Sequence, residues 1–137
     1  MEMPEAFFPA HTILQIAEAT LEGEIALAEG DSVAAVDQFE TAVRLQDALP
    51  YMEPPYWFNS ARLDLGRAHL AADQPAEAAE VFEVDLVEYP ENGWALHGLQ
   101  ASLAAQGHHL AAEDTGARFD AAWHDDGIDV GALHRAW

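Results

Sequence analysis

Glycine, alanine and phenylalanine recur at a fixed spacing along this chain, and that spacing constrains the fold more than any other feature of the sequence. Intervals of 12 and then four residues separate the members of two sets, Gly23, Ala35, Phe39 and Gly66, Ala78, Phe82. A third, looser unit begins at Gly98, with Ala111 in the alanine place and Thr115 in the phenylalanine place. Such self-similarity predicts a repeat architecture, in which each unit packs against its neighbours.

The distances between the units indicate an insertion after the first one. Gly66 lies 43 residues after Gly23, whereas Gly98 lies 32 residues after Gly66. Both intervals approach the period of about 34 residues typical of helix-turn-helix repeats if about nine residues are inserted after the first unit. We place this insert at about residues 50–55, which contain three prolines.

Helix start and stop signals agree with a division into three helical hairpins. Thr12 and Gln15 form a capping box, Asp31 can cap the second helix, and Pro54 and Pro55 suit the start of the third. Later signals follow the same plan: a start at Gln74-Pro75, a stop at Tyr89-Pro90, a cap at Asn92, and a break at Gly107 between helices 93–106 and 109–123.

The expected organisation is one all-α domain over residues 1–137. Its hairpins cover about 12–49, about 55–89 and about 92–123, and a tail over 124–137 contains one more turn. No segment alternates in the two-residue rhythm of a half-buried strand.

Several packing positions identify a family resemblance. They are Leu65, Gly66, Ala78, Phe82 and Pro90, followed by Trp94 and Gly98. These positions resemble the tetratricopeptide repeat (TPR) family, and the resemblance implies a short right-handed α-α superhelix of about three hairpins with a C-terminal capping turn. The chain departs from the family pattern at Glu22, Asp85 and His97, so we expect those sites to be distorted or specialised.

A second resemblance is more specific. The string Tyr51-Met52-Glu53-Pro54-Pro55-Tyr56-Trp57, then Arg62, then Pro90-Glu91-Asn92-Gly93-Trp94, is similar to the C-terminal part of a group of bacterial TPR proteins, over about residues 20–125. The resemblance implies that the chain is either a short relative or the C-terminal piece of a longer protein. In the second case, its partner would be the missing upstream part.

Charge excludes several function classes. The chain has 25 acidic residues against five arginines, for a formal net charge of −20, which argues against nucleic acids and anionic membranes as partners. The acidity either recruits a basic partner or serves solubility in salt. Cysteine is absent, and we find neither a secretory signal nor an apolar run long enough to span a bilayer, so we expect a cytoplasmic protein.

The insert is the first candidate binding site. Tyr51, Glu53 and Trp57 place aromatic rings beside a carboxylate, which suits a basic or proline-rich peptide. The alternative is a rigid connector, in which Pro54 and Pro55 hold an extended approach to the next helix while Tyr56, Trp57 and Phe58 fill the core. We expect Phe58 to be buried.

A groove lined by the first helix of each hairpin is the second candidate. Its inward candidates are Glu24, Leu63, Arg67, Leu70, Asn92, Ala95 and Leu99. Beside it, Trp57, Arg62 and Trp94 would bound a cleft that is either open and polar-rimmed or closed by the insert itself. We expect Arg62 and Arg67 to pair with acids such as Asp64 or Glu53; the alternative is that they bind an anionic ligand group.

Neither metal binding nor catalysis is predicted. His109 and Glu113 share one helix face, but the sequence specifies no third ligand, and a polar helix start explains the pair equally well. No phosphate loop, nucleophile elbow or HExxH motif is present. We therefore predict no enzyme activity and no cofactor.

The sequence thus predicts a TPR-type scaffold that binds a protein or peptide through the two candidate surfaces. The alternative is a structural or dimerisation module that terminates a larger assembly. Apolar residues surround the first helix more widely than one contact face can absorb, and Phe7 and Phe8 precede it. We therefore predict a homodimer through residues 7–27, unless Phe7 and Phe8 fold back onto the helix within one monomer.

Overall fold

The fold was analysed in a computed structural model that describes residues 9–123. Within that range all regular structure is α-helical, in six helices and no strand: α1 (Ala10–Glu29), α2 (Ser32–Asp47), α3 (Ala61–Ala71), α4 (Pro75–Glu88), α5 (Gly93–Ala105) and α6 (His109–Ala122). The all-α prediction is confirmed for these residues. The predicted turn in 124–137 and the placement of Phe7 and Phe8 lie outside the described residues.

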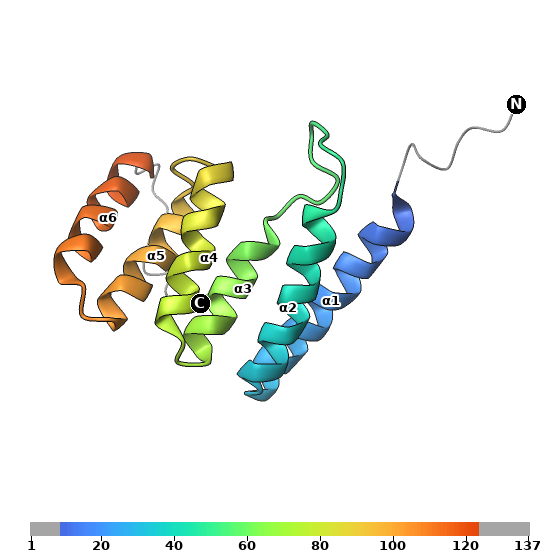
Figure 1. The fold of residues 1–137 in the computed structure, drawn as a ribbon, viewed down its shortest axis with the longest axis horizontal. Helices are drawn as coiled ribbons and strands as arrows, with labels where there is room; N and C mark the ends of the chain where they lie inside the picture. The colour runs from blue at the N-terminus through green and yellow to red at the C-terminus, as the bar shows by residue number, and fades with distance from the viewer. Residues whose placement is uncertain (1–8, 124–137) are drawn as a thin grey trace, which may run out of the picture.

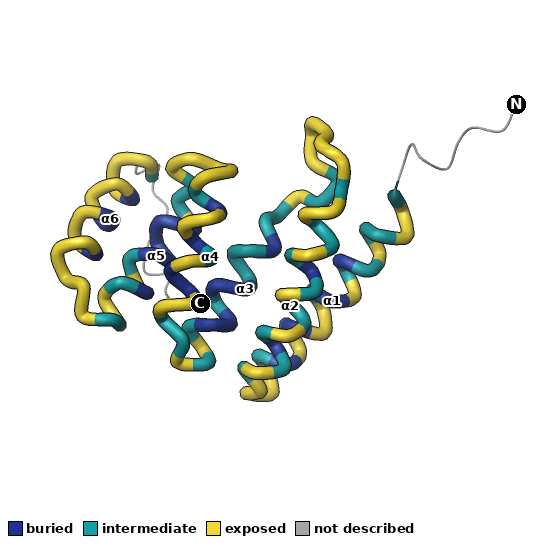
Figure 2. The backbone as a smooth tube through the Cα atoms, in the orientation of Figure 1, coloured by how far each residue is buried: buried dark blue, intermediate teal, exposed yellow. Residues whose placement is uncertain are grey.

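The helices are stacked in a row in chain order (Figure 1). Each helix packs against the next one. The first helices of successive hairpins are also in contact, α1 with α3 and α3 with α5. This is a helical-repeat-like arrangement of three hairpins. Burial is concentrated in α3 and α5, whereas the loop after α2 and the outer side of α6 are exposed (Figure 2).

Three helix starts follow their predicted capping or proline signals and two do not. The Asp31 side chain accepts a hydrogen bond from the amide of Ala34 at 3.0 Å, and α4 begins at Pro75. Asn92 caps α5 by accepting from the amide of Trp94 at 3.2 Å. The capping box at Thr12 is wrong, because α1 already begins at Ala10 and so places Thr12 inside its first turn.

The helix start predicted at Pro54-Pro55 is also wrong, because α3 begins only at Ala61. The connection therefore spans residues 48–60, and we call it the insert. The Gln46 side chain fixes its far end: its Nε2 donates to the carbonyl of Asn59 at 3.0 Å, and its Oε1 accepts from the amide of Ala61 at 2.8 Å. The Ala61 amide lies in the first turn of α3, where no carbonyl of the helix can accept from it, and Gln46 supplies the missing acceptor.

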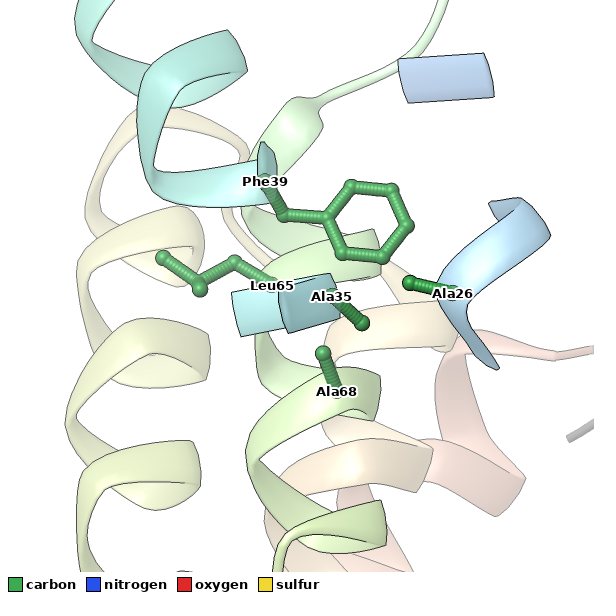
Figure 3. Packing of buried hydrophobic residues seen from close by; sticks show 5 residues of the cluster. All are labelled: Ala26, Ala35, Phe39, Leu65 and Ala68. Carbon is green, nitrogen blue, oxygen red and sulfur yellow. The ribbon is translucent and has the colours of Figure 1, made fainter. Parts of the chain in front are cut away.

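The repeated residues form the core, as predicted. Phe39 packs with Ala26, Ala35, Leu65 and Ala68, which come from the first two hairpins (Figure 3). The equivalent pair in the second unit, Ala78 and Phe82, is fully buried.

The third unit corrects one assignment. Ala111 is exposed, and the buried alanine is Ala112, three residues into its helix as Ala35 and Ala78 are in theirs. The offset arises because 11 residues separate Gly98 from the start of α6 at His109, against nine in the other units. Gly116 consequently takes the place that Phe39 and Phe82 occupy.

Candidate functional site

Three hollows adjoin one another where the insert meets the start of α3 and the end of α4. Tyr89, which directly follows α4, lines all three. The insert projects between α2 and α3, beyond the ends of the helices along one edge of the row (Figure 1), and we call this region, from the insert to Tyr89 and Trp94, the insert edge. Six of the seven predicted binding residues line it: Tyr51, Glu53, Trp57, Arg62, Asn92 and Trp94.

The first hollow, here named the acidic hollow, has a volume of about 310 Å³. Glu53 and Glu88 are its charged residues, and its walls are completed by Gln46, Leu49, Pro50, Tyr51, Met52, Pro55, Tyr56, Trp57 and Tyr89. The Tyr51 hydroxyl donates a hydrogen bond to Glu53, which raises the pKa of Tyr51. The Tyr51 side chain is 86% exposed, so this aromatic-carboxylate pair faces solvent.

The second hollow, here named the neutral hollow, has a volume of about 340 Å³ and no charged residue in its walls. They comprise Pro55, Trp57, Phe58, Asn59, Ser60, Leu63, Tyr89, Asn92 and Trp94. Trp57 is anchored because it also packs against the core around Ile16 and Ala61. The prediction that Phe58 is buried is wrong: it is 90% exposed and contacts the Trp57 ring at a centroid distance of 5.3 Å.

The third hollow, of about 260 Å³, contains Arg62 beside Asp47, Glu88 and Tyr89. The Arg62 guanidinium lies 2.5 Å from Asp47 and 3.7 Å from Glu88. The hydrogen bond to Asp47 raises the pKa of Arg62. The predicted pairing is confirmed, but its partners are the acids that end α2 and α4, not Asp64 or Glu53.

The cleft expected between Trp57, Arg62 and Trp94 is therefore divided. Trp57 and Trp94 line the neutral hollow, whereas Arg62 lies in the third one. Both hollows are open at the surface, and the insert forms part of their walls.

Glu88 and Tyr89 also line these hollows, although the sequence did not predict them as site residues. Burial, followed by the charge of Glu88, raises the pKa of Tyr89. In a helical hairpin, the end of the second helix lies beside the start of the first helix. Tyr89 comes directly before Pro90, which ends the second helix of its hairpin, and this position was the sequence signal that could have placed Tyr89 near Arg62.

Arg67 lies apart from the insert edge. It forms ion pairs with Glu24 of α1 and with Asp64 of α3, the second at 3.4 Å, and thereby links two hairpins. Its predicted pairing with Asp64 is confirmed. Burial raises the pKa of Asp64 to about 6 even though the positive charge of Arg67 opposes the shift.

Two predicted groove residues are core residues instead. Ala95 and Leu99 are buried against α4, with Leu63 and Leu70 packed at the same cluster. They cannot contact a ligand, because the first helices of neighbouring hairpins approach each other closely there.

The departures from the repeat pattern differ in their environments. Glu22 is exposed, whereas His97 is buried beside the Phe119 ring. Asp85 is fully buried, and its Oδ2 accepts a hydrogen bond from the Asn92 side chain at 2.9 Å, while its Oδ1 has no hydrogen-bond partner. Asn92 thus caps α5 and ties it to α4.

The outer side of α1 carries an exposed apolar stripe. Leu14, Leu21 and Ile25 are exposed at helical spacing, and Glu18 and Glu22 lie exposed beside them. The expectation that apolar residues of this helix face outward is confirmed.

His109 and Glu113 are both exposed on α6. Among residues 9–123, no three histidine or acidic side chains gather as a metal site requires. In the same range, no helix combines the length and the apolar character needed to cross a bilayer.

Comparisons of this chain with protein-family models, curated proteins and solved structures gave no match.

Proposed function

We propose that this chain is a binding module of the TPR type, and that its insert edge binds a basic or proline-rich segment of another protein. The observation that carries the proposal is the gathering of three open hollows around Tyr89, with Trp57 and Trp94 in one of them. Long inserts between otherwise short connections are commonly functional. The other four connections between successive helices have only two to four residues outside the helices.

Charge supports a basic ligand. Glu53, Glu88 and Asp47 line these hollows, and Arg62 is the one basic residue among their walls. Because Arg62 already pairs with Asp47 and Glu88, an anionic ligand would have to displace both acids. A cation would instead meet excess carboxylate and exposed aromatic faces, which attract it through the ring quadrupole.

Assignment to the TPR type, with its right-handed superhelix, rests on the repeated packing. The glycine of each of the first two units faces the phenylalanine of the same unit, and helices that start successive hairpins touch. Repeat stacks of this kind present extended surfaces for binding.

The proposal can be tested with isotopically labelled protein. A synthetic peptide that alternates arginine and proline should shift the indole signals of Trp57 and Trp94, and a glutamate-proline peptide of equal length should not. Shifts confined to other parts of the protein, or equal shifts with both peptides, would refute the site.

The second candidate function is a dimerisation module, and the exposed stripe on α1 favours it. Leu14, Leu21 and Ile25 are separated by seven and four residues, so they lie along one side of the helix and could pack against the same side of a second copy. This function uses a surface other than the insert edge, and the two can coexist.

A further inference from the structure

The acidic and neutral hollows share walls but differ in charge. Pro55, Trp57 and Tyr89 line both of them. Glu53 and Glu88 line the acidic hollow, which has no basic residue, and the neutral hollow has no ionisable acid or base apart from the Tyr89 phenol. An extended ligand that crosses Tyr89 therefore meets two different chemical environments in succession.

We propose that the insert edge reads a two-part peptide motif, an inference that rests on the function proposed above. An arginine or lysine side chain occupies the acidic hollow. A proline or aliphatic side chain a few residues away occupies the neutral hollow. Charge sets which hollow each part reaches, so the order of the two parts sets the direction in which the ligand crosses Tyr89.

The acidic hollow fits a cation for two reasons. Tyr51 donates its only hydroxyl proton to one oxygen of Glu53, so the carboxylate keeps acceptor capacity for a guanidinium or ammonium group. Glu88 is more than half exposed, so it remains accessible as a second acceptor beside its contacts with Arg62 at 3.7 Å and with the Tyr89 hydroxyl. The rings of Tyr51 and Tyr89 supply aromatic faces beside these acids.

The neutral hollow fits an uncharged side chain. A charged group there would lose water without gaining an opposite charge, which is costly. Phe58 offers an almost fully exposed ring, and Trp94 contributes a second partly exposed ring to the lining, so a proline or aliphatic group can pack against aromatic surface. Asn59 and Ser60 supply polar groups for the backbone of an extended ligand.

The test uses a factorial panel of short peptides with blocked termini. Each contains one arginine and one proline separated by zero to four alanines, and its counterparts replace arginine by glutamine, proline by alanine, or both. Isothermal titration calorimetry on the whole chain measures affinity. At the best spacing, each replacement should weaken binding by about two- to fivefold, the range expected for single exposed cation–π or apolar contacts.

Two protein variants assign each part of the motif to its hollow. Glu53→Gln should reduce the advantage of arginine over glutamine, because only Glu88 remains as a charged acceptor, and should leave the advantage of proline over alanine. Phe58→Ala should do the reverse. Both side chains are exposed, so the fold should persist, which unchanged melting midpoints would verify. Leu110→Ala, at an exposed site on α6, is the control and should change neither preference.

The outcomes separate this inference from the proposed function. Binding at the insert edge in which both variants weaken all peptides equally overturns the two-part motif and leaves the binding function standing. An affinity that does not depend on the number of alanines between the arginine and the proline also overturns the two-part motif and leaves the binding function standing. A panel in which no peptide binds overturns both.

Discussion

The ring of Phe82 lies against the backbone of Gly98, so closely that a Cβ atom added to Gly98 would come within 2.2 Å of the ring Cζ. The same ring also meets Gly66 of its own hairpin, where an added Cβ would lie at 2.4 Å. Phe82 is fully buried. One side chain therefore holds the second and third hairpins together, and glycine is the residue that leaves room for it.

Replacing Phe82 by alanine should destabilise the chain by about 3 to 5 kcal/mol, because it removes a large buried side chain and leaves a cavity. Chemical denaturation followed by circular dichroism measures the change. A loss within about 0.5 kcal/mol, the range of ordinary surface substitutions, would contradict the assignment of Phe82 to the core.

Gly98→Ala should cost about 1 to 3 kcal/mol through overpacking, although alanine is the better helix former. Combining it with Phe82→Leu should recover part of that loss, since the smaller side chain makes room for the methyl group. The two substitutions would then be non-additive in a double-mutant cycle. Strict additivity would mean that the methyl group and the ring do not compete for the same space.

Asp64 should make stability depend on pH. Its pKa is about 6 in the folded chain and about 4 when unfolded, so the contribution of its protonated form is complete below pH ~4 and is lost as the pH rises through ~6. Asp64→Asn, which mimics the protonated acid, should therefore stabilise the protein by about 1 to 3 kcal/mol at pH 8. The gain should shrink toward pH 5 in parallel urea titrations. A gain that does not change with pH would show that Asp64 titrates normally.

Gln46 should control the order of the insert. Gln46→Ala removes the hydrogen bonds to Asn59 and Ala61, at a cost of about 1 to 3 kcal/mol, and should speed proteolytic cleavage within residues 48–60. Gln106→Ala is the matched control, because it removes comparable bonds to Pro75 and Ser102 far from the insert. Equal cleavage in the two variants would argue against this role for Gln46.

Salt should affect the two proposed functions in opposite directions. Binding of a basic peptide at the insert edge should weaken as salt rises, because screening reduces its attraction to Glu53 and Glu88. Association through α1 should strengthen, because screening reduces repulsion between the acids beside the stripe in two copies, each with a net charge of −20. Light scattering and calorimetry over one salt series compare the two.

The dimer itself should depend on the exposed stripe of α1. Leu14→Glu with Leu21→Glu should give a monomer in light scattering, whereas Leu110→Glu at the exposed apolar position on α6 should not. A monomer mass for the unmodified chain at tens of micromolar would exclude the dimer under those conditions.

Local spacing by itself determined the helices and their core faces. The four-residue intervals from Ala35 to Phe39 and from Ala78 to Phe82 placed each pair on one helix face, and both pairs are buried, because helical periodicity specifies which side chains share a face. Capping residues such as Asp31 and Asn92 marked helix starts, because their side chains bond to amides only two or three residues away.

The tertiary structure alone decided the composition of the candidate site. Whether Phe58 is buried depends on what lies opposite the insert, and nothing near it in the sequence records that. Likewise, Arg62 pairs with Asp47 and Glu88, and Tyr89 and Trp57 line one hollow, because the ends of α2 and α4 both lie beside the start of α3. Contacts along an edge where several helices end are set by the relative placement of whole helices, which no local pattern of residues encodes.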